Sequence, residues 1–317
     1  MSIRRIAMAG SAGFLALALA ACGGGTGDNG DDTNGAEDTN GAEDTAGGEE
    51  GGEDLGTITL GYIPSWTDGL STAYLLDNLL TDIGYTVEHQ TVEDAAILYA
   101  GLANGDIDMY ASAWSERTHR QYMDEYEDQL EDLGYYYEGA VLNLSVPEYT
   151  DIDSIDELVG KGDEFGGEIV GIEPGAGLTD ATENDVMPGY GLDDEYRLVT
   201  SSTSTMLTEL QNAVDAEEDI VVTLWSPFWA NAEFPVKALE DPEGYFGEPE
   251  NLHWLARDGF SEDFPEATEL VGKIKLDDDE YGSLEDTVVN QFDDGEEPEA
   301  IEAWLEENQD LMDSMLG

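Results

Sequence analysis

Apolar residues follow two alternating patterns along the chain from Thr57 onward. Short runs rich in Val, Ile, Leu and Tyr are typical of β-strands, and most are followed by segments with the apolar spacing of amphipathic helices. This alternation predicts an α/β fold in which helices flank mainly parallel sheets. The predicted strands are 57–63, 85–92, 106–114, 135–146, 166–173, 220–224 and 252–257. The predicted helices are 70–80, 95–103, 117–130, 153–159, 205–214, 265–273, 283–292 and 298–315.

The run 220–224 is the most informative of these strands. It is short and apolar, which is typical of a strand buried on both faces of a parallel sheet, and ligands collect beyond the carboxyl ends of such strands. Trp225 stands at that end, and Trp66 and Trp114 follow two other predicted strands in the same way. A single tryptophan there is more often core. Three aromatic faces at one place instead indicate a site for a cation without an N–H group, such as a quaternary ammonium.

Two of the predicted strands, 135–146 and 252–257, are placed to carry the chain between two lobes. Trp66 and Trp114 would then belong to the first lobe and Trp225 to the second. A ligand in the cleft between the lobes would bridge all three rings. The predicted lobes are residues 57–145 together with 252–317, and residues 146–251.

A glycine-rich stretch and one histidine add candidate polar contacts. GIEPGAGLTD, residues 171–180, follows a strand and begins a helix. Free backbone N–H groups of Gly177 and Leu178 at a helix N-terminus suit a carboxylate. A plain turn or a phosphate loop are the other interpretations, although the stretch lacks a Walker lysine and the full GxGxxG pattern. His119 lies five residues after Trp114 in the first turn of the next predicted helix. A lone histidine is usually structural.

The first 56 residues predict two non-globular segments. Residues 1–22 contain Arg4 and Arg5, then an apolar run that ends in LAAC, which is typical of a secretion signal. The cysteine resembles that of a lipoprotein box, in which Cys22 would be lipidated and become the new N-terminus. Residues 23–56 consist largely of Gly, Asp, Glu, Thr and Asn, and they predict a disordered acidic tether. With one cysteine in the chain, no disulfide framework is expected.

The strongly acidic charge balance argues against nucleic acid as a partner and indicates a saline medium. The 10 basic and 74 acidic residues give a net charge of −64, so nucleic acid is not expected as a partner. Such a surface repels itself, and because molar salt shortens the screening length to about 3 Å, the composition indicates adaptation to a saline medium. The acidic residues show no EF-hand-like spacing, so neither a metal site nor a cofactor is predicted.

A secreted acidic hydrolase is the alternative from another functional class. Glu173 and Asp180 both lie near the proposed cleft, and paired carboxylates can carry out acid–base chemistry. The chain has no Ser-His-Asp signature, HExxH or GxSxG motif. A tethered interaction domain without a small ligand is the third interpretation.

Five stretches in order carry a family resemblance: GYIPSWTDG, SAWSERTHRQY, GIEPGAGLTD, IVVTLWSPFW and LEDPEGYFG. Together they resemble the glycine betaine/proline betaine substrate-binding lipoproteins of osmoprotectant ABC transporters, from Thr57 to the C-terminus. The resemblance implies a two-lobed periplasmic-binding-protein-like fold that holds a trimethylammonium group in a box of tryptophans. By this resemblance the box is Trp66, Trp114 and Trp225, and the ligand carboxylate meets the Gly177 and Leu178 N–H groups and the His119 side chain.

The resemblance also implies a role without catalysis. The protein would capture glycine betaine or a related zwitterion and deliver it to an ABC permease with its ATPase. It would act at the extracellular face of the cell membrane, held there by a lipid anchor at Cys22.

Overall fold

The structure is a computed structural model, and it describes residues 55–316. The predicted signal peptide with Cys22, and residues 23–54 of the predicted tether, lie outside this range. Leu55 and Gly56, which the sequence placed in the tether, already make backbone hydrogen bonds. The Leu55 N–H donates to the Gly84 carbonyl at 3.1 Å, and the Thr86 N–H donates to the Gly56 carbonyl at 2.9 Å. Between residues 55 and 316, no helix has the length and apolar character needed to cross a membrane.

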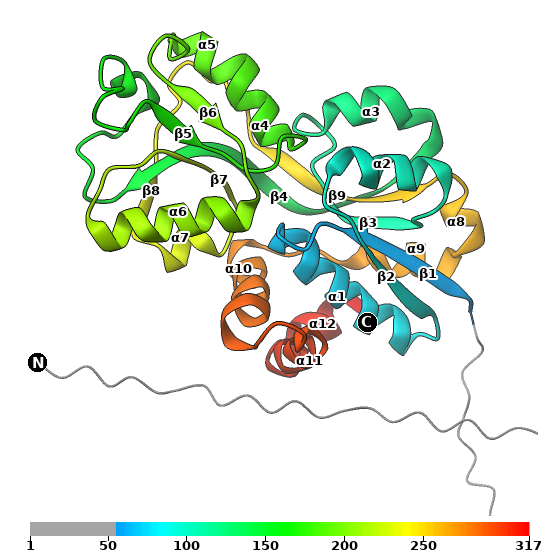
Figure 1. The fold of residues 1–317 in the computed structure, drawn as a ribbon. Coiled ribbons are helices and arrows are strands. Elements are labelled where there is room, and N and C mark those ends of the chain that lie inside the picture. Colours follow the sequence, from blue (N-terminus) through cyan, green and yellow to red (C-terminus); the bar gives the residue numbers. More distant parts are fainter. Residues whose placement is uncertain (1–54, 317) are drawn as a thin grey trace, which may run out of the picture. The chain divides into compact units, whose positions relative to one another are not determined.

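Nine strands in the described part of the chain are paired, and eight of them form one continuous path (Figure 1). Their order is β2-β1-β3-β9-β4-β7-β5-β6, with β8 also paired to β4. The strands are β1 (Thr57–Tyr62), β2 (Thr86–Thr91), β3 (Met109–Ala113), β4 (Leu130–Pro147), β5 (Glu168–Val170), β6 (Arg197–Val199), β7 (Val222–Ser226), β8 (Val236–Ala238) and β9 (Glu250–Arg257).

Strand β4 belongs to both halves of this path. From Leu130 to Ala140 it pairs antiparallel with β9, and from Val141 to Pro147 it pairs antiparallel with β7 and β8. We call the part built on β1, β2, β3, β9 and the first half of β4 the first lobe. The part built on β5 to β8 and the second half of β4 is the second lobe. The two-lobed α/β class predicted from the sequence is confirmed. The lobe boundaries at 145/146 and 251/252 stay a prediction.

Helices cover both faces of the first sheet. Because β1 has β2 and β3 as parallel neighbours on opposite sides, right-handed crossovers place α1 and α2 on opposite faces. Figure 1 shows α2 and α3 on one side of the sheet and α1 with α10 to α12 on the other. The helices of this lobe are α1 (Thr67–Asp82), α2 (Ala95–Asn104), α3 (Arg120–Tyr126), η1 (Glu127–Gln129), α8 (Phe260–Asp263), α9 (Pro265–Lys273), α10 (Asp278–Asp286), η4 (Thr287–Gln291), α11 (Glu297–Glu307) and α12 (Gln309–Leu316).

The second lobe is smaller and has shorter elements. Its longest helix, α6 (Thr203–Ala216), follows the N-cap residue Ser202, whose side chain accepts from the Thr205 N–H at 3.2 Å. The remaining helices of this lobe are η2 (Ile155–Leu158), α4 (Gly177–Ala181), η3 (Thr182–Val186), α5 (Met187–Tyr190) and α7 (Ala230–Glu233).

Two local predictions are corrected by tertiary pairing. The predicted helix 117–130 is shorter, because α3 ends at Tyr126 and β4 begins at Leu130, which pairs with Arg257 of β9. The run 220–224 was expected in a parallel sheet. Strand β7 instead starts at Val222 and pairs antiparallel with β4 over five residues, and parallel with β5 only at Val222. In both places the long linking strand β4 decides the neighbour, and local periodicity cannot reveal a pairing partner so distant in sequence.

Candidate ligand-binding site

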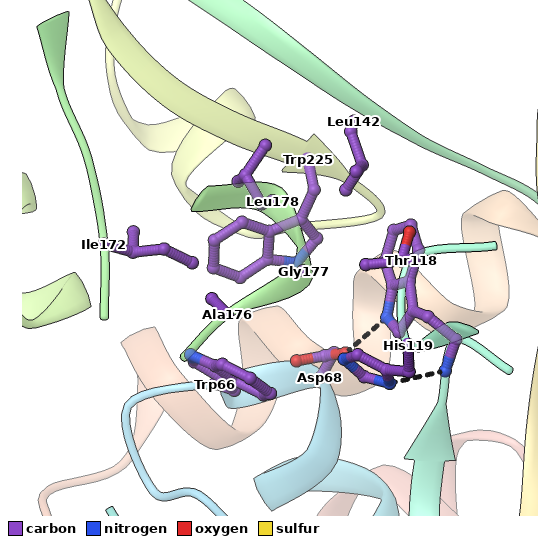
Figure 2. A pocket seen from close by; sticks show the side chains of 11 residues that line it. Trp66, Asp68, Thr118, His119, Leu142, Ile172, Ala176, Gly177, Leu178 and Trp225 are labelled. Atoms are coloured by element: carbon purple, nitrogen blue, oxygen red, sulfur yellow. Dashed lines mark hydrogen bonds between the residues drawn. The ribbon is translucent and has the colours of Figure 1, made fainter. Parts of the chain in front are cut away.

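A small cavity lies between side chains of both lobes (Figure 2). All six residues that the sequence singled out for ligand binding line it. Its lining is Trp66, Asp68, Trp114, Thr118, His119, Leu142, Ile172, Ala176, Gly177, Leu178 and Trp225.

The three tryptophans come from three separate elements. Trp66 is the residue before α1, Trp114 directly follows β3, and Trp225 lies in β7. Each ring is held by a neighbouring side chain. The Trp66 Nε1–H donates to Glu173 at 3.0 Å, the Trp114 Nε1–H donates to Asp68 at 3.4 Å, and the Trp225 ring stacks on Phe228 with centroids 3.9 Å apart. The indole N–H groups of Trp66 and Trp114 therefore have partners, which leaves ring faces for a ligand.

His119 is buried as a neutral imidazole with one N–H left for a ligand. Its Nδ1 accepts from the Trp114 backbone N–H at 3.2 Å and lies 2.9 Å from the Tyr99 hydroxyl. Burial lowers the pKa of His119 from 6.5 to about 3, so the ring carries one proton, and because Nδ1 is an acceptor that proton is on Nε2. Within residues 55–316 no protein group accepts from Nε2. The ring stacks on Trp66 at 6.0 Å between centroids and 12° between planes.

The glycine-rich stretch supplies backbone donors at the start of a helix. α4 continues through η3 and α5 to Tyr190, and its first internal hydrogen bond runs from the Asp180 N–H to the Ala176 carbonyl at 3.1 Å. Within the described range, the N–H groups of Gly177 and Leu178 have no acceptor. Such first-turn N–H groups, at the positive end of the helix dipole, suit an anion.

Two of the three glycines of this stretch, Gly175 and Gly177, are needed for close approach to the first lobe. A Cβ on Gly177 would lie 2.0 Å from the Thr118 carbonyl oxygen, and one on Gly175 would lie 2.6 Å from the Asp94 carboxylate. Neither glycine has a positive φ angle. The opposing lobe therefore leaves no room for a side chain at either position. The sequence could not indicate this, because the contacts are with residues of the other lobe.

Asp68 is the pocket residue of greatest chemical interest that the sequence reasoning missed. One of its carboxylate oxygens, Oδ2, accepts from the Ser112 hydroxyl at 2.6 Å and from Trp114 Nε1, and only 3% of the residue is exposed. Burial raises the pKa of this carboxyl group. The sequence indicated this residue only by its position, two residues after Trp66 in GYIPSWTDG, one of the five stretches that carry the family resemblance. The partner Ser112 lies 44 residues away, which only the fold reveals.

The acid pair considered for a hydrolase does not form a site. Glu173 accepts four hydrogen bonds, and Asp180 is exposed and accepts from the Asn184 side chain at 2.8 Å. Neither lines the cavity. The hydrolase interpretation is therefore not supported. The described residues also contain no cluster of three His, Cys, Asp or Glu side chains arranged to hold a metal ion.

Two α/β lobes with a shared cavity define the class of two-lobed solute-binding proteins. Residues 56–307 match the family described as the substrate-binding domain of ABC-type glycine betaine transport systems. The chain belongs to this family. Members are extracellular or periplasmic components of ABC importers.

Three similar proteins give the family context. A glycine betaine/carnitine transport binding protein of Listeria monocytogenes is 36% identical over 152 residues, which cover 47% of this chain and 49% of the relative. The matched stretch thus spans about half the length of that relative. The crystal structure of a glycine/betaine/L-proline-binding protein from Borrelia burgdorferi is 33% identical with a TM-score of 0.75, and covers 82% of this chain and 96% of its own. A lactococcal protein in its closed conformation with glycine betaine is 28% identical with a TM-score of 0.75, and covers 82% and 99%.

Proposed function

We propose that this protein captures glycine betaine, or a closely related quaternary ammonium zwitterion, and delivers it to an ABC permease powered by its ATPase. The observation that carries this proposal is the composition of one cavity. It combines three tryptophan rings with donors that suit a carboxylate, and so matches both ends of the ligand.

The tryptophan end suits a cation that cannot donate a hydrogen bond. A trimethylammonium group must be held by dispersion and by attraction to the ring faces, each ring contributing about 0.5–2 kcal/mol. The rings of Trp66, Trp114 and Trp225 are between 4% and 7% exposed, so water screens the attraction little. Asp68 adds a carboxyl group beside the same space (Figure 2).

The same cavity also offers donors without a positive charge. The N–H groups of Gly177 and Leu178 and the Nε2–H of neutral His119 are free to donate to a carboxylate. Choline carries a hydroxyl group in place of the carboxylate. It would leave one or two of these buried donors unpaired, at a cost of about 1–3 kcal/mol each. We therefore expect the pocket to prefer betaines to choline.

The relatives support the same ligand class. The lactococcal protein was solved with glycine betaine, and the Listeria and Borrelia proteins are named for it. With three rings and a satisfied carboxylate, we expect roughly micromolar affinity, about −8 kcal/mol.

Isothermal titration calorimetry with glycine betaine, in buffer of high salt concentration, tests the proposal. Proline betaine, carnitine and choline form the comparison series. Saturable one-to-one binding of a betaine with weaker binding of choline is the expected result. Absence of binding by every member of the series, from a protein shown by circular dichroism to be folded, would contradict it.

We further propose that Cys22 carries the lipid anchor and that residues 23–54 tether the binding unit to the outer face of the membrane in a saline medium. The LAAC sequence and the net charge of −64 support these assignments. In an expression host, Cys22→Ala should abolish incorporation of labelled fatty acid and release the protein from the membrane fraction. Unchanged labelling would contradict the anchor.

A further inference from the structure

Glu173 is a buried carboxylate that joins the two lobes beside the pocket. It belongs to the second lobe, in the loop between β5 and α4, and 9% of it is exposed. From the first lobe, the Ser65 hydroxyl donates to Oε1 at 3.1 Å and the Trp66 Nε1–H donates to Oε2 at 3.0 Å. From its own lobe, the Thr203 N–H donates to Oε1 and the Thr203 hydroxyl donates to Oε2, both at 2.9 Å.

These four hydrogen bonds occupy both oxygens of the Glu173 carboxylate. Each oxygen accepts from one N–H group and one hydroxyl group. Thr203 is the first residue of α6, so the helix dipole also favours a negative charge there. Glu173 is thus fixed in the second lobe and receives the indole of a first-lobe tryptophan.

We infer that Glu173 is a positioning residue for Trp66, which ties completion of the tryptophan box to closure of the lobes. The inference rests on the proposed function. When the lobes separate, Trp66 loses the acceptor that fixes the edge of its ring. When they close, the ring is held between Glu173 at its N–H and His119 against its face. The third wall of the box and the closed state therefore form together.

The substitution Glu173→Gln isolates this link, because each oxygen of Glu173 accepts from an N–H group that cannot reverse its polarity. A glutamine offers one oxygen and one NH₂ group, so it satisfies either the Thr203 N–H or the Trp66 Nε1–H. Thr203 lies in the same lobe and is fixed in place. We therefore expect the amide oxygen to face Thr203 and the NH₂ group to oppose the indole N–H.

A double-mutant cycle with glycine betaine as ligand measures the coupling. We expect Glu173→Gln to weaken binding at least about tenfold, and Trp66→Phe, which keeps a ring but lacks the N–H group, to weaken it by a similar factor. In the Glu173→Gln background, Trp66→Phe should cost little more, because the bond is already lost. Trp225→Phe provides the matched control, because the Trp225 ring lines the same pocket without touching Glu173. The double variant Glu173→Gln/Trp225→Phe should therefore lose affinity by the product of the two single losses.

A second control separates this role from lobe contact in general. The Tyr122 hydroxyl donates to the Gly175 carbonyl at 2.7 Å and so joins the same two lobes, but it touches no ring of the box. Tyr122→Phe should not couple to Trp66→Phe. The inference is overturned if Glu173→Gln binds betaine as tightly as the wild type. It is also overturned if the affinity losses of Glu173→Gln and Trp66→Phe multiply in the double variant, as those of Glu173→Gln and Trp225→Phe should.

One spectroscopic measurement keeps the inference testable if the proposed function fails. In ¹⁵N-indole spectra, the Trp66 Nε1–H signal, assigned by its loss in Trp66→Phe, should move in Glu173→Gln and stay in Tyr122→Phe. The shift should be present without betaine, from the fraction of molecules whose lobes are closed, and larger with betaine. A wild type that binds no betaine refutes the function. An indole signal indifferent to Glu173→Gln refutes the positioning role. If Glu173→Gln does not fold, Ser65→Ala replaces it in the cycle, with an expected loss of about two- to fivefold.

Discussion

The two lobes contribute to the pocket in different ways. The first lobe supplies Trp114, His119 and Asp68 as side chains bonded to one another or to their own lobe: Asp68 accepts from Trp114, and His119 accepts from the Trp114 backbone. The second lobe supplies one ring, Trp225, apolar side chains such as Leu142 and Ile172, and main-chain N–H groups of a loop whose glycines press against the first lobe. The first-lobe part of the site is held mainly by hydrogen bonds within that lobe. The second-lobe part reaches its position only through contact with the first lobe.

This difference indicates an order of assembly. The side chains of Trp114, His119 and Asp68 can keep their arrangement when the lobes separate, because opening breaks none of these hydrogen bonds. Trp66 differs, because its acceptor Glu173 belongs to the second lobe. The amides of Gly177 and Leu178 reach the ligand only when their loop lies against Thr118. We therefore expect the first lobe to receive the ligand and the second lobe to close over it, and four predictions test this contrast.

The largest effect is expected from Gly177→Ala. The new methyl group would lie 2.0 Å from the Thr118 carbonyl oxygen, so the closed state is blocked while the separated lobes are unaffected. Betaine affinity should fall about a hundredfold or more, with little change in thermal stability. Gly272→Ala in α9, where nothing lies within 4 Å of the added carbon, is the matched control and should bind normally. Normal binding by Gly177→Ala would show that closure is not needed.

The next effect concerns the rings, one from each lobe. Trp114→Ala and Trp225→Ala should each weaken betaine binding by about tenfold or more, because each removes a ring face. Titration calorimetry measures the loss, and thermal unfolding monitored by circular dichroism verifies the fold. Trp304→Phe, in a fully buried core position away from the pocket, controls for loss of a tryptophan. Wild-type affinity in either folded alanine variant would remove that ring from the site.

A smaller, selective effect is expected from His119→Ala. Removal of the Nε2–H donor should weaken the binding of betaine more than that of choline, since one buried donor to a carboxylate is lost. The ratio of the two affinities should fall about tenfold. Competition assays with both ligands measure the ratio. His253→Ala, at a histidine bonded to Asp132 and Glu116 outside the pocket, should leave it unchanged. An equal loss for both ligands would mean that His119 acts only as a support for Trp114.

The smallest effect concerns the pH dependence of stability in the first lobe. Glu285 in α10 accepts from the Thr67 hydroxyl beneath the Trp66–Asp68 segment, and burial raises its pKa from 4.5 to about 8. Between these values the folded state binds the extra proton. This stabilisation is complete below pH 4.5 and is lost as the pH rises through 8, by at most about 1.4 kcal/mol per pH unit.

The wild type should therefore lose more thermal stability than Glu285→Gln as the pH is raised from about 5 to 8. Differential scanning calorimetry of both proteins measures the difference. Glu302→Gln, at an exposed position of α11, should follow the wild type. Parallel curves for wild type and Glu285→Gln would show that Glu285 titrates as an ordinary exposed carboxyl group.

The sequence was sufficient for several of the elements and for six residues of the cavity lining. Apolar spacing located β1, β2, α2 and α9 to within a residue or so, because each is set by its own local pattern. Their position at strand ends predicted that Trp66, Trp114 and Trp225 contribute to a site, and the helix start at Gly177 predicted the backbone donors. All of these line one cavity. Their roles toward a ligand stay a prediction.

Only the tertiary structure decided what depends on a distant partner. The switch from helix to strand at Leu130 follows from pairing with Arg257, and the antiparallel neighbour of β7 follows from the path of β4. The four hydrogen bonds of Glu173 and the partners of Asp68 join residues between 30 and 108 positions apart. Local propensity and periodicity reach over a few residues, whereas these contacts exist only once the chain has brought its two lobes together.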